Sequence, residues 1–439
     1  MENKTQKNQP IVYVGMSADI IHPGHINLLN EATKYGRVIV GLLTDEAIAS
    51  YKRVPFLSYS QRFSIVSNLV GVSEVIPQES LDYTSNLNLI KPNFVVHGDD
   101  WKSGIQSKTR AAVIKALEGW GGNLIEVPYF EGISSTQLIN KLTRNGITPD
   151  FRVNSLQRLL SSKPYLRFAD VHSGISALII EHTSVEKNGL NLSFDGMWSS
   201  SLVDSTSIGK PDNESVDIST RINGLQQVLE VTTKPIIFDG DTGGRAEHFV
   251  HNVRTLERNG ISAVIIEDKI GLKRNSLYGN EVIQNLDDPM NFSEKIKAGL
   301  EAKTNENFMI IARIESLIVD AGMNDALNRA QIYLDAGADG IMIHSRNTKP
   351  DEIFEFAAEY KKWNTNKPLV LVPTTFNSVI EEDLAEKGAR IIIHANHLLR
   401  ASYPAMVKVA EKILQNGRTL EADSNLMSIK EILNLVPGG

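Results

Sequence analysis

Three acidic side chains stand at the ends of two neighbouring apolar runs in the second half of the chain. Asp239 and Asp241 follow the run PIIF, and Glu267 ends the run AVII. Residues two apart on an extended chain point the same way, so the two aspartates can face one site. Carboxylate oxygens suit a hard cation such as Mg²⁺. The spacing therefore predicts a metal site, beside which Arg313 and His344, at the ends of the next two apolar runs, would meet an anionic substrate.

A second group of chemically capable residues lies near the N-terminus. Gly15 ends the first apolar run, and His22 and His25 flank a Pro-Gly pair where a helix is expected to begin. The free N–H groups and the positive end of the dipole at a helix N-terminus favour phosphate. Gly24 lets the backbone approach a nucleotide closely. This pattern indicates a phosphate site to which the two histidines add charge or hydrogen bonds.

The N-terminal group needs strands that end at one edge of a sheet. Apolar runs alternate with segments of helical period through the first third of the chain, which is typical of a parallel α/β sheet. We predict a domain over residues 1–142 and a linker over residues 143–154, which include Gly146 and Pro149. The expected strands are residues 11–14, 37–43, 74–76, 93–97 and 124–127, and the expected helices include residues 26–34, 61–69 and 108–118.

The acidic group needs a different scaffold. Strand and helix candidates repeat eight times after the linker, which predicts a (β/α)8 barrel over residues 155–439, with its chemistry at the carboxyl ends of the strands. The strand cores are continuously apolar, as expected for strands buried on both faces. An open doubly wound sheet is the alternative, and a closed ring is the simpler solution. The strand candidates are residues 166–170, 194–198, 235–239, 263–267, 308–314, 340–344, 369–373 and 390–394.

Composition narrows the class of protein. The 439 residues hold 45 Lys and Arg against 52 Asp and Glu, a net charge of −7, which argues against a chain built to bind nucleic acid or an anionic membrane. Cysteine is absent, which excludes disulfides, thiolate metal sites and a cysteine nucleophile. No apolar run approaches the roughly 18–20 residues of a membrane span, and the polar N-terminus lacks the apolar core of a secretory signal. We expect a cytoplasmic protein that has no membrane or nucleic-acid partner.

The N-terminal pattern resembles the HxGH motif of the nucleotidyltransferase superfamily, and of its cytidylyltransferase branch in particular. Near the end of the domain, ISSTQLI resembles the ISSTxI signature of that branch, in which hydroxyls and a helix N-terminus hold the triphosphate. The resemblance covers about residues 10–142 and implies a Rossmann-like domain. It would transfer CMP from CTP to an acceptor with loss of pyrophosphate, helped by Mg²⁺.

The resemblance assigns roles to residues of this domain. The structural alternatives are a helix cap for the three hydroxyl residues, a turn for Asp99 and a solvated helix face for Arg62, which opens the next helix. For Arg62 and Asp99 the structural and functional interpretations carry equal weight. The implied catalytic residues are His22, His25 and Lys52, and the implied nucleotide-binding residues are Gly15, Gly24, Asp99, Ser134, Ser135 and Thr136.

In the second half, the run EDKIGLKRNS from Glu267 to Ser276 resembles the EDKxxxxxNS signature of phosphoenolpyruvate mutase, in the isocitrate lyase/phosphoenolpyruvate mutase superfamily. Residues 198–202, WSSSL, resemble the family's substrate loop, with Ser201 where glycine is common. The resemblance covers about residues 155–435. It implies Mg²⁺-dependent conversion of phosphoenolpyruvate to phosphonopyruvate, in which the phosphoryl group moves from oxygen to carbon while water is excluded.

This resemblance also assigns roles. The segment that carries Lys273 and Asn275 would close over the site as a lid. Among the charged residues at the strand ends, Asp268 and Glu315 are the ones that a structural role would explain most readily. The implied metal ligands are Asp239, Asp241 and Glu267, the implied catalytic residues are Asp212, Lys273, Asn275 and His344, and the implied substrate-binding residues are Trp198, Ser200, Ser201, Leu202, Ser276 and Arg313.

Related activities of the superfamily can be compared with this chain. The lyases of isocitrate and methylisocitrate use a cysteine in the same segment, and this chain has none. Phosphonopyruvate hydrolases resemble this sequence but typically have threonine where Asn275 stands, so the asparagine favours a mutase.

The layout resembles fused enzymes of fosfomycin biosynthesis. It predicts a bifunctional enzyme of phosphonate biosynthesis whose CMP acceptor is a small phosphonate such as 2-hydroxyethylphosphonate or 2-aminoethylphosphonate. The alternative is a phosphonopyruvate hydrolase barrel with a non-catalytic, nucleotide-binding regulatory domain. By analogy with the family we also expect a homo-oligomer, a dimer or tetramer, to which residues 428–435 contribute.

Overall fold

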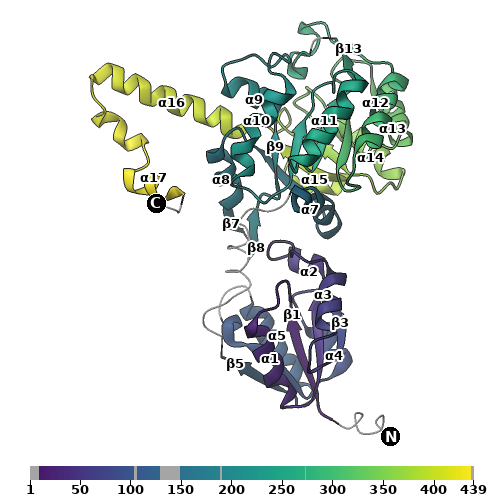
Figure 1. The fold of residues 1–439 in the computed structure, drawn as a ribbon, viewed down its shortest axis with the longest axis vertical. Coiled ribbons are helices and arrows are strands. Elements are labelled where there is room, and N and C mark those ends of the chain that lie inside the picture. The colour runs from purple at the N-terminus through teal and green to yellow at the C-terminus, as the bar shows by residue number, and fades with distance from the viewer. Residues whose placement is uncertain (1–8, 103–105, 129–148, 188–189, 272, 437–439) are drawn as a thin grey trace. The chain divides into compact units, whose positions relative to one another are not determined.

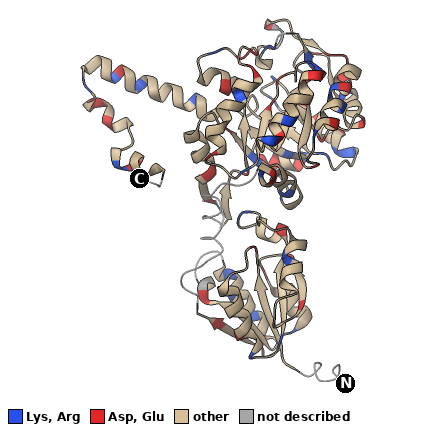
Figure 2. Ribbon diagram, viewed as in Figure 1, with Lys and Arg blue, Asp and Glu red and all other residues tan. Residues whose placement is uncertain are grey.

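A computed structural model describes residues 9–102, 106–128, 149–187, 190–271 and 273–436. By its internal contacts the chain divides into two compact units, one formed by residues 1–166 and 183–193, the other by residues 167–182 and 194–439. Lys, Arg, Asp and Glu are interspersed along both (Figure 2). Among the described helices, none combines the length and apolar character needed to span a membrane.

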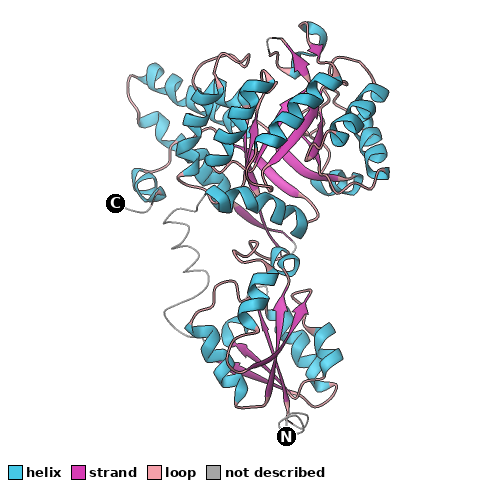
Figure 3. Cartoon of the chain, turned by 45° about the vertical axis from the view of Figure 1, so that its right-hand side comes forward, coloured by secondary structure: helices cyan, strands magenta, loops and turns pink. Residues whose placement is uncertain are grey.

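The first unit is built on a parallel sheet of five strands in the order β3-β2-β1-β4-β5 (Figures 1 and 3). The central strands β1 and β2 are almost wholly buried, because helices cover both faces of a sheet of this kind. The strands are β1 (Ile11–Met16), β2 (Arg37–Leu43), β3 (Val72–Gln78), β4 (Phe94–Gly98) and β5 (Asn123–Val127). The helices are α1 (Pro23–Thr33), α2 (Asp45–Ala49), α3 (Tyr59–Val66), α4 (Thr84–Ile90), η2 (Asp99–Lys102), α5 (Ser107–Glu118) and α7 (Pro149–Ser162).

Two features of this unit depart from the predicted organisation. Residues 149–154, expected in the linker, form the first turns of α7, which Arg158 ties to the unit by hydrogen bonds to the carbonyls of Pro55 and Phe56 (2.7 and 2.8 Å). Strands β7 (Ser184–Lys187) and β8 (Leu190–Ser193) pair as an antiparallel hairpin, which the apolar pattern did not predict. Both hairpin strands are largely exposed, so they carry none of the burial signal of the other strands.

The second unit is a closed barrel of eight parallel strands in the order β10-β11-β14-β15-β16-β17-β6-β9. This confirms the predicted (β/α)8 barrel, and the sheet of the first unit confirms the Rossmann-like domain. Every predicted barrel strand is present within a few residues of its expected bounds. The strands are β6 (Leu166–Asp170), β9 (Gly196–Ser199), β10 (Ile236–Asp239), β11 (Ala263–Glu267), β14 (Met309–Ile314), β15 (Gly340–Ile343), β16 (Leu369–Leu371) and β17 (Ala389–His394).

Helices surround the barrel, and a short excursion follows β11. The helices are α8 (Gly174–His182), α9 (Ser201–Ser207), α10 (Ile218–Leu229), α11 (Ala246–Arg258), α12 (Pro289–Ala302), α13 (Met323–Asp335), α14 (Asp351–Lys362), α15 (Glu381–Lys387) and α16 (His397–Asn416). The excursion comprises β12 (Lys269–Ile270), η3 (Ser276–Glu281) and β13 (Asn285–Leu286). We call residues 269–286 the lid segment.

The C-terminal arm differs from the rest of the barrel. It consists of α16, η4 (Leu420–Asn425) and α17 (Ile429–Leu435), and it extends away from the barrel (Figure 1). No residue of α16 or α17 is buried, although both helices carry large apolar side chains.

Candidate active sites

Two carboxylates of the acidic group face the ammonium of Lys273. Asp239 ends β10, Asp241 follows it and Glu267 ends β11, and all three are buried. Lys273 of the lid segment contacts Asp241, lies 3.1 Å from Asp212 and lies 4.0 Å from Asp239, measured from its Nζ to a carboxylate oxygen. Burial alone would raise the pKa of Asp239, but the positive charges of Lys273, Arg313 and Arg221 hold it well below its usual range. The predicted lid lysine therefore balances the predicted metal ligands.

The turn at the end of β10 differs from the expected extended chain. Strand β10 stops at Asp239, and Asp241 has a φ of 54°, in the left-handed region. Strand alternation therefore does not aim the two aspartates, as the spacing had suggested. Instead, the Asp241 N–H donates to Asp239 Oδ1 (3.2 Å), and Lys273 faces both carboxylates. A Cβ on Gly240 would lie 2.7 Å from Val264, so the tight turn requires glycine.

Glu267 supplies the observation that tests a metal ion here. Both of its carboxylate oxygens are buried and have no hydrogen-bond partner among the described residues, although Lys269 and Arg313 lie 3.3 and 3.2 Å away. Burial raises the pKa of Glu267 to about 7. No described group of three acidic or histidine side chains is arranged as a complete metal site, since Lys273 lies among the aspartates. The unsatisfied oxygens and all-carboxylate donor set nevertheless fit a hard divalent cation.

The predicted substrate-binding cation lies at the ends of β14 and β15. The Arg313 Nη2 atom is 2.7 Å from Ser276 Oγ and 3.1 Å from His344 Nδ1. Burial, together with the charge of Arg313, lowers the pKa of His344, so its imidazole is neutral near pH 7. The structure brings these three predicted residues together beside Glu267. The Ser276 hydroxyl is already bonded to protein groups rather than open to a substrate.

The predicted substrate loop follows β9. Trp198 is buried in the strand, and Ser200 is the residue before α9. Ser201 donates from its N–H (3.3 Å) and its hydroxyl (2.9 Å) to Asp239 Oδ2, and its hydroxyl also contacts Lys273. Leu202 lies in the first turn of α9, partly buried. The serine at the position where glycine was expected thus links the loop to the acidic group.

The lid segment is anchored by two side chains. Asn275 Nδ2 donates to Asp212 (2.8 Å), the same carboxylate that pairs with Lys273. Asn275 Oδ1 accepts the N–H of Leu277 (3.0 Å) and so caps η3. The structure therefore joins three predicted residues into one contact between the lid segment and the loop before α10.

One buried cation in this site escaped the sequence analysis. Arg221 of α10 donates to the backbone carbonyl of Asp239 (2.6 Å), to Asp241 Oδ2 (3.1 Å) and to Asp204 Oδ2 (3.0 Å). Its guanidinium also lies over the ring of Phe238, 4.2 Å from the centroid. Arg221 therefore fixes both aspartates from behind, and no motif in its neighbourhood marks it.

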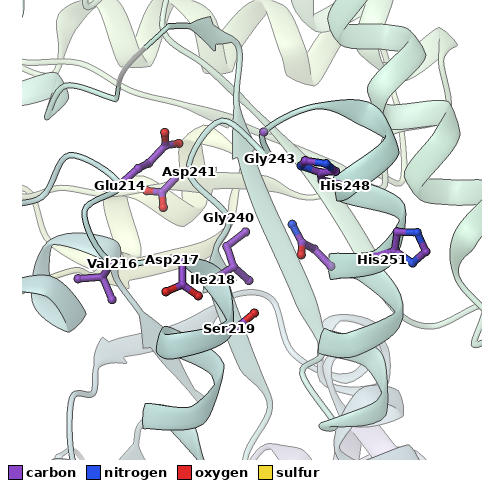
Figure 4. Close-up of a pocket in the computed structure, with 12 residues that line it drawn as sticks. Glu214, Val216, Asp217, Ile218, Ser219, Gly240, Asp241, Gly243, His248 and His251 are labelled. Atoms are coloured by element: carbon purple, nitrogen blue, oxygen red, sulfur yellow. The ribbon is translucent and has the colours of Figure 1, made fainter.

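A pocket of about 430 Å³ adjoins the acidic group (Figure 4). It lies between the loop before α10 and the start of α11, and Asp241 forms part of its wall. Glu214, Asp217, His248 and His251 also line it. Burial and the neighbouring Asp241 raise the pKa of Glu214. Of the acidic group, Asp241 is the member that lines this pocket.

In the first unit, the HxGH residues build the N-terminus of α1. His22 is the N-cap, its Nδ1 accepting the N–H of Gly24 (3.1 Å), and His25 Nδ1 accepts the N–H of His22 (3.4 Å). A ring nitrogen that accepts carries no proton, so both neutral imidazoles carry theirs on Nε2. Burial, with the charges of His22 and Lys52, lowers the pKa of His25 to about 4. Both rings are therefore neutral donors at a helix N-terminus.

Charged side chains support the loop before α1: Asp19 and Arg62 are buried, and Lys52 is exposed. Lys52 Nζ lies 3.4 Å from Ser17 Oγ, and Asp19 accepts the N–H of Leu57 (3.1 Å). Arg62 is completely buried; it donates to the Ser17 carbonyl (2.6 Å) and pairs with Asp45 (2.7 Å). The alternative of a solvated helix face for Arg62 is therefore wrong. Arg62 instead holds Ser17, the residue of this loop that Lys52 contacts.

The remaining predicted residues of this unit are placed as follows. Gly15 lies against the ring of Tyr83. A Cβ added to Gly15 would lie 2.3 Å from the Cζ atom of Tyr83, so the ring leaves no room for a side chain. Gly24 lies in the first turn of α1, and Asp99 begins η2 at the end of β4, the strand beside β1. Ser134, Ser135 and Thr136 lie outside the described residues.

Two family models match the chain. The model described as phosphoenolpyruvate phosphomutase matches residues 156–414, and the model described as cytidylyltransferase-like matches residues 13–141. The first match spans more than half of the chain, and the second covers the unit that holds the HxGH residues.

Individual relatives match the barrel. A phosphoenolpyruvate phosphomutase of Tetrahymena pyriformis is 32% identical over 65% of this chain and 91% of its own length. A phosphonopyruvate hydrolase of Variovorax sp. is 36% identical over 59% of this chain and 89% of its own length. The crystal structure of a phosphoenolpyruvate phosphomutase from Streptomyces platensis subsp. rosaceus superposes with a TM-score of 0.58 at 33% identity, covering 64% of this chain and 93% of that one.

A phosphonopyruvate hydrolase in complex with oxalate and Mg²⁺ superposes with a TM-score of 0.57 at 33% identity, covering 66% of this chain and 95% of that one. Mutases and a hydrolase are thus similar to the barrel to nearly the same degree. The chain belongs to the phosphoenolpyruvate phosphomutase family and carries a cytidylyltransferase-like domain before the barrel.

Proposed function

We propose that the barrel converts phosphoenolpyruvate to phosphonopyruvate. The observation that carries this proposal is the convergence of three buried carboxylates with Arg313 and His344 beneath a lid segment that carries Lys273. Phosphoenolpyruvate offers a carboxylate and a phosphoryl group to this arrangement. Mg²⁺ held by Asp239, Asp241 and Glu267 would supply positive charge to an oxyanion of the substrate.

The side chains divide the work. The Arg313 guanidinium binds the substrate carboxylate, and the neutral His344 ring hydrogen-bonds the phosphoryl group without itself changing protonation. The bond from the enol oxygen to phosphorus breaks and a bond from carbon to phosphorus forms, so no proton or electron is gained or lost. Water would divert the departing phosphoryl group. Trp198 and the lid segment, anchored through Asn275 and Asp212, exclude it.

A phosphonopyruvate hydrolase is the second candidate, favoured by the 36% identity to the Variovorax enzyme. Asn275 supports the mutase instead. Its amide both caps η3 and donates to Asp212, and the shorter side chain of threonine would not span both partners. A lid segment held at both points gives the phosphoryl group less access to water.

Phosphorus NMR distinguishes these two activities. The full chain is incubated with phosphonopyruvate and Mg²⁺. The reaction is thus followed in the direction that breaks the carbon–phosphorus bond. Formation of phosphoenolpyruvate is expected. Free phosphate with an equal amount of pyruvate would instead establish the hydrolase and overturn the mutase.

For the first unit we propose transfer of CMP from CTP to a small phosphonate, such as 2-hydroxyethylphosphonate or 2-aminoethylphosphonate. Two Nε2–H donors at the N-terminus of α1, with Lys52 beside the preceding loop, favour the charge that develops as pyrophosphate leaves. The test is pyrophosphate release from CTP with each phosphonate in turn. Tight CTP binding with no pyrophosphate released from any acceptor would indicate a regulatory nucleotide-binding domain.

A further inference from the structure

One buried carboxylate of the barrel serves several of the proposed substrate-binding groups. Glu315 follows β14, two residues after Arg313, and is completely buried. Its backbone N–H donates to Asp268 (2.9 Å), which fixes the chain at this point. Its carboxylate accepts from Arg313 Nε (2.6 Å) and from the Ser276 hydroxyl. Lys269 Nζ and His344 Nδ1 lie 3.1 and 3.2 Å away.

The hydroxyl of Ser276 shows how completely this arrangement is defined. A hydroxyl has one hydrogen to donate and two lone pairs that accept. Ser276 donates to Glu315 and accepts from Arg313 Nη2 (2.7 Å) and Lys269 Nζ (3.0 Å). Every bonding position of the hydroxyl is therefore used, and the first residue of η3 is held between two cations and one carboxylate.

The orientation of the substrate-binding groups depends on the same carboxylate. A guanidinium is planar, so fixing Nε of Arg313 on Glu315 sets the direction of its two remaining nitrogens. His344 Nδ1 lies within hydrogen-bond distance of both Glu315 and Arg313, so these two groups set the plane of its ring. Removing the charge of Glu315 would leave Glu267 alone, of these two carboxylates, to balance both Arg313 and Lys269.

We infer that Glu315, a residue that from the sequence could still be merely structural, is a positioning residue for the barrel reaction: it orients Arg313 and His344 and, through Ser276, ties the lid segment to them. The inference rests on the proposed function of the barrel. It concerns the fit of the site to an anionic substrate and no step of proton transfer.

Substitutions of Glu315 separate positioning from stability. In E315Q the side chain keeps its size, but its NH₂ group turns a donor toward Arg313, Lys269 or Ser276, which are themselves donors. In E315D the charge remains one methylene further back. The matched control is E257Q, because Glu257 of α11 is also buried and accepts hydrogen bonds from Thr304 (2.7 and 3.0 Å), outside the site.

The full-length variants are compared by kcat and KM for phosphonopyruvate and by calorimetric binding of oxalate in the presence of Mg²⁺. E315Q is expected to lower kcat by a hundredfold or more and to weaken oxalate binding at least tenfold, while E315D recovers part of both. E257Q is expected to keep kcat, KM and oxalate affinity within about threefold, even where its Tm falls as far as that of E315Q.

Wild-type kinetics and oxalate affinity in E315Q, at whatever Tm, would overturn the positioning role. Failure of the proposed function has a different signature: the wild-type chain would neither turn over phosphonopyruvate nor bind oxalate. A third outcome is that the wild type hydrolyses phosphonopyruvate and binds oxalate, and that E315Q weakens this binding. This result would overturn the mutase activity but retain the positioning role of Glu315.

Discussion

His25 illustrates how one residue links fold and chemistry in the first unit. Its pKa is lowered from 6.5 to about 4 by burial and by the nearby charges of His22 and Lys52. Between these values the unfolded chain binds a proton that the folded chain does not, so folding stability falls as the pH falls from about 6.5 to about 4. The loss attributable to His25 is on the order of 3 kcal/mol.

Urea unfolding of the full chain and of H25N checks this expectation. The difference in unfolding free energy between the two proteins removes the contributions of other titrating groups. The unfolding free energy of the wild type minus that of H25N should fall as the pH is lowered through this window. It should stay constant above pH 7. A difference that does not vary with pH would mean that His25 titrates normally.

Other residues show which part of a site a sequence can reveal. The acidic group, Arg313 and His344 stand at strand ends, where parallel topology alone brings side chains together. Arg221 has no such signal. Arg221 lies near the start of α10, and its burial depends on Asp204 and Asp241, which come from two other segments of the chain. A network of this kind forms only in the folded chain.

At the scale of elements, the buried strands were predictable and the exposed ones were not. Continuous apolar runs identified all eight barrel strands, because burial on both faces requires them. The hairpin β7–β8 is held by strand pairing with exposed side chains, which leaves no apolar pattern. The prediction of an extended chain after β10 was wrong, because Asp241 has a left-handed conformation and its carboxylate is held by Arg221 and Lys273.

The C-terminal arm supports the proposed homo-oligomer. Leu414, Ile429 and Leu433 are 84%, 75% and 74% exposed. Large exposed apolar surfaces usually mark an interface. We expect a second copy of the chain to bury them. Ser428 caps α17. We expect the full chain to behave as a dimer or tetramer in light scattering.

Replacing these three leucine and isoleucine residues with serine tests the arm. The triple variant is expected to dissociate to a lower oligomer or to monomers, with the CMP-transfer activity retained. The control replaces exposed apolar residues outside the arm, Val70 and Leu89, which are 94% and 82% exposed. If the triple variant keeps the wild-type mass, the arm takes no part in assembly.

At the scale of the molecule, each proposed site draws its described residues from one compact unit. The HxGH residues and Lys52 lie in the first unit, and the acidic group lies in the second. The two proposed reactions share no intermediate. Phosphonopyruvate, the proposed product of the barrel, must be changed by other reactions before it resembles a small CMP acceptor. Two independent sites in one chain are therefore expected.

Reciprocal variants test this independence. D239A removes a carboxylate that faces Lys273 and is expected to lower mutase turnover by three orders of magnitude or more while CMP transfer stays within twofold. H22A removes the N-cap of α1 and should do the converse. Phosphorus NMR follows the first reaction and pyrophosphate release the second, on the same preparations, with D239N separating loss of charge from loss of volume. Loss of both activities in a folded D239N protein would contradict independent sites. It would show that CMP transfer in the first unit depends on the acidic group of the barrel.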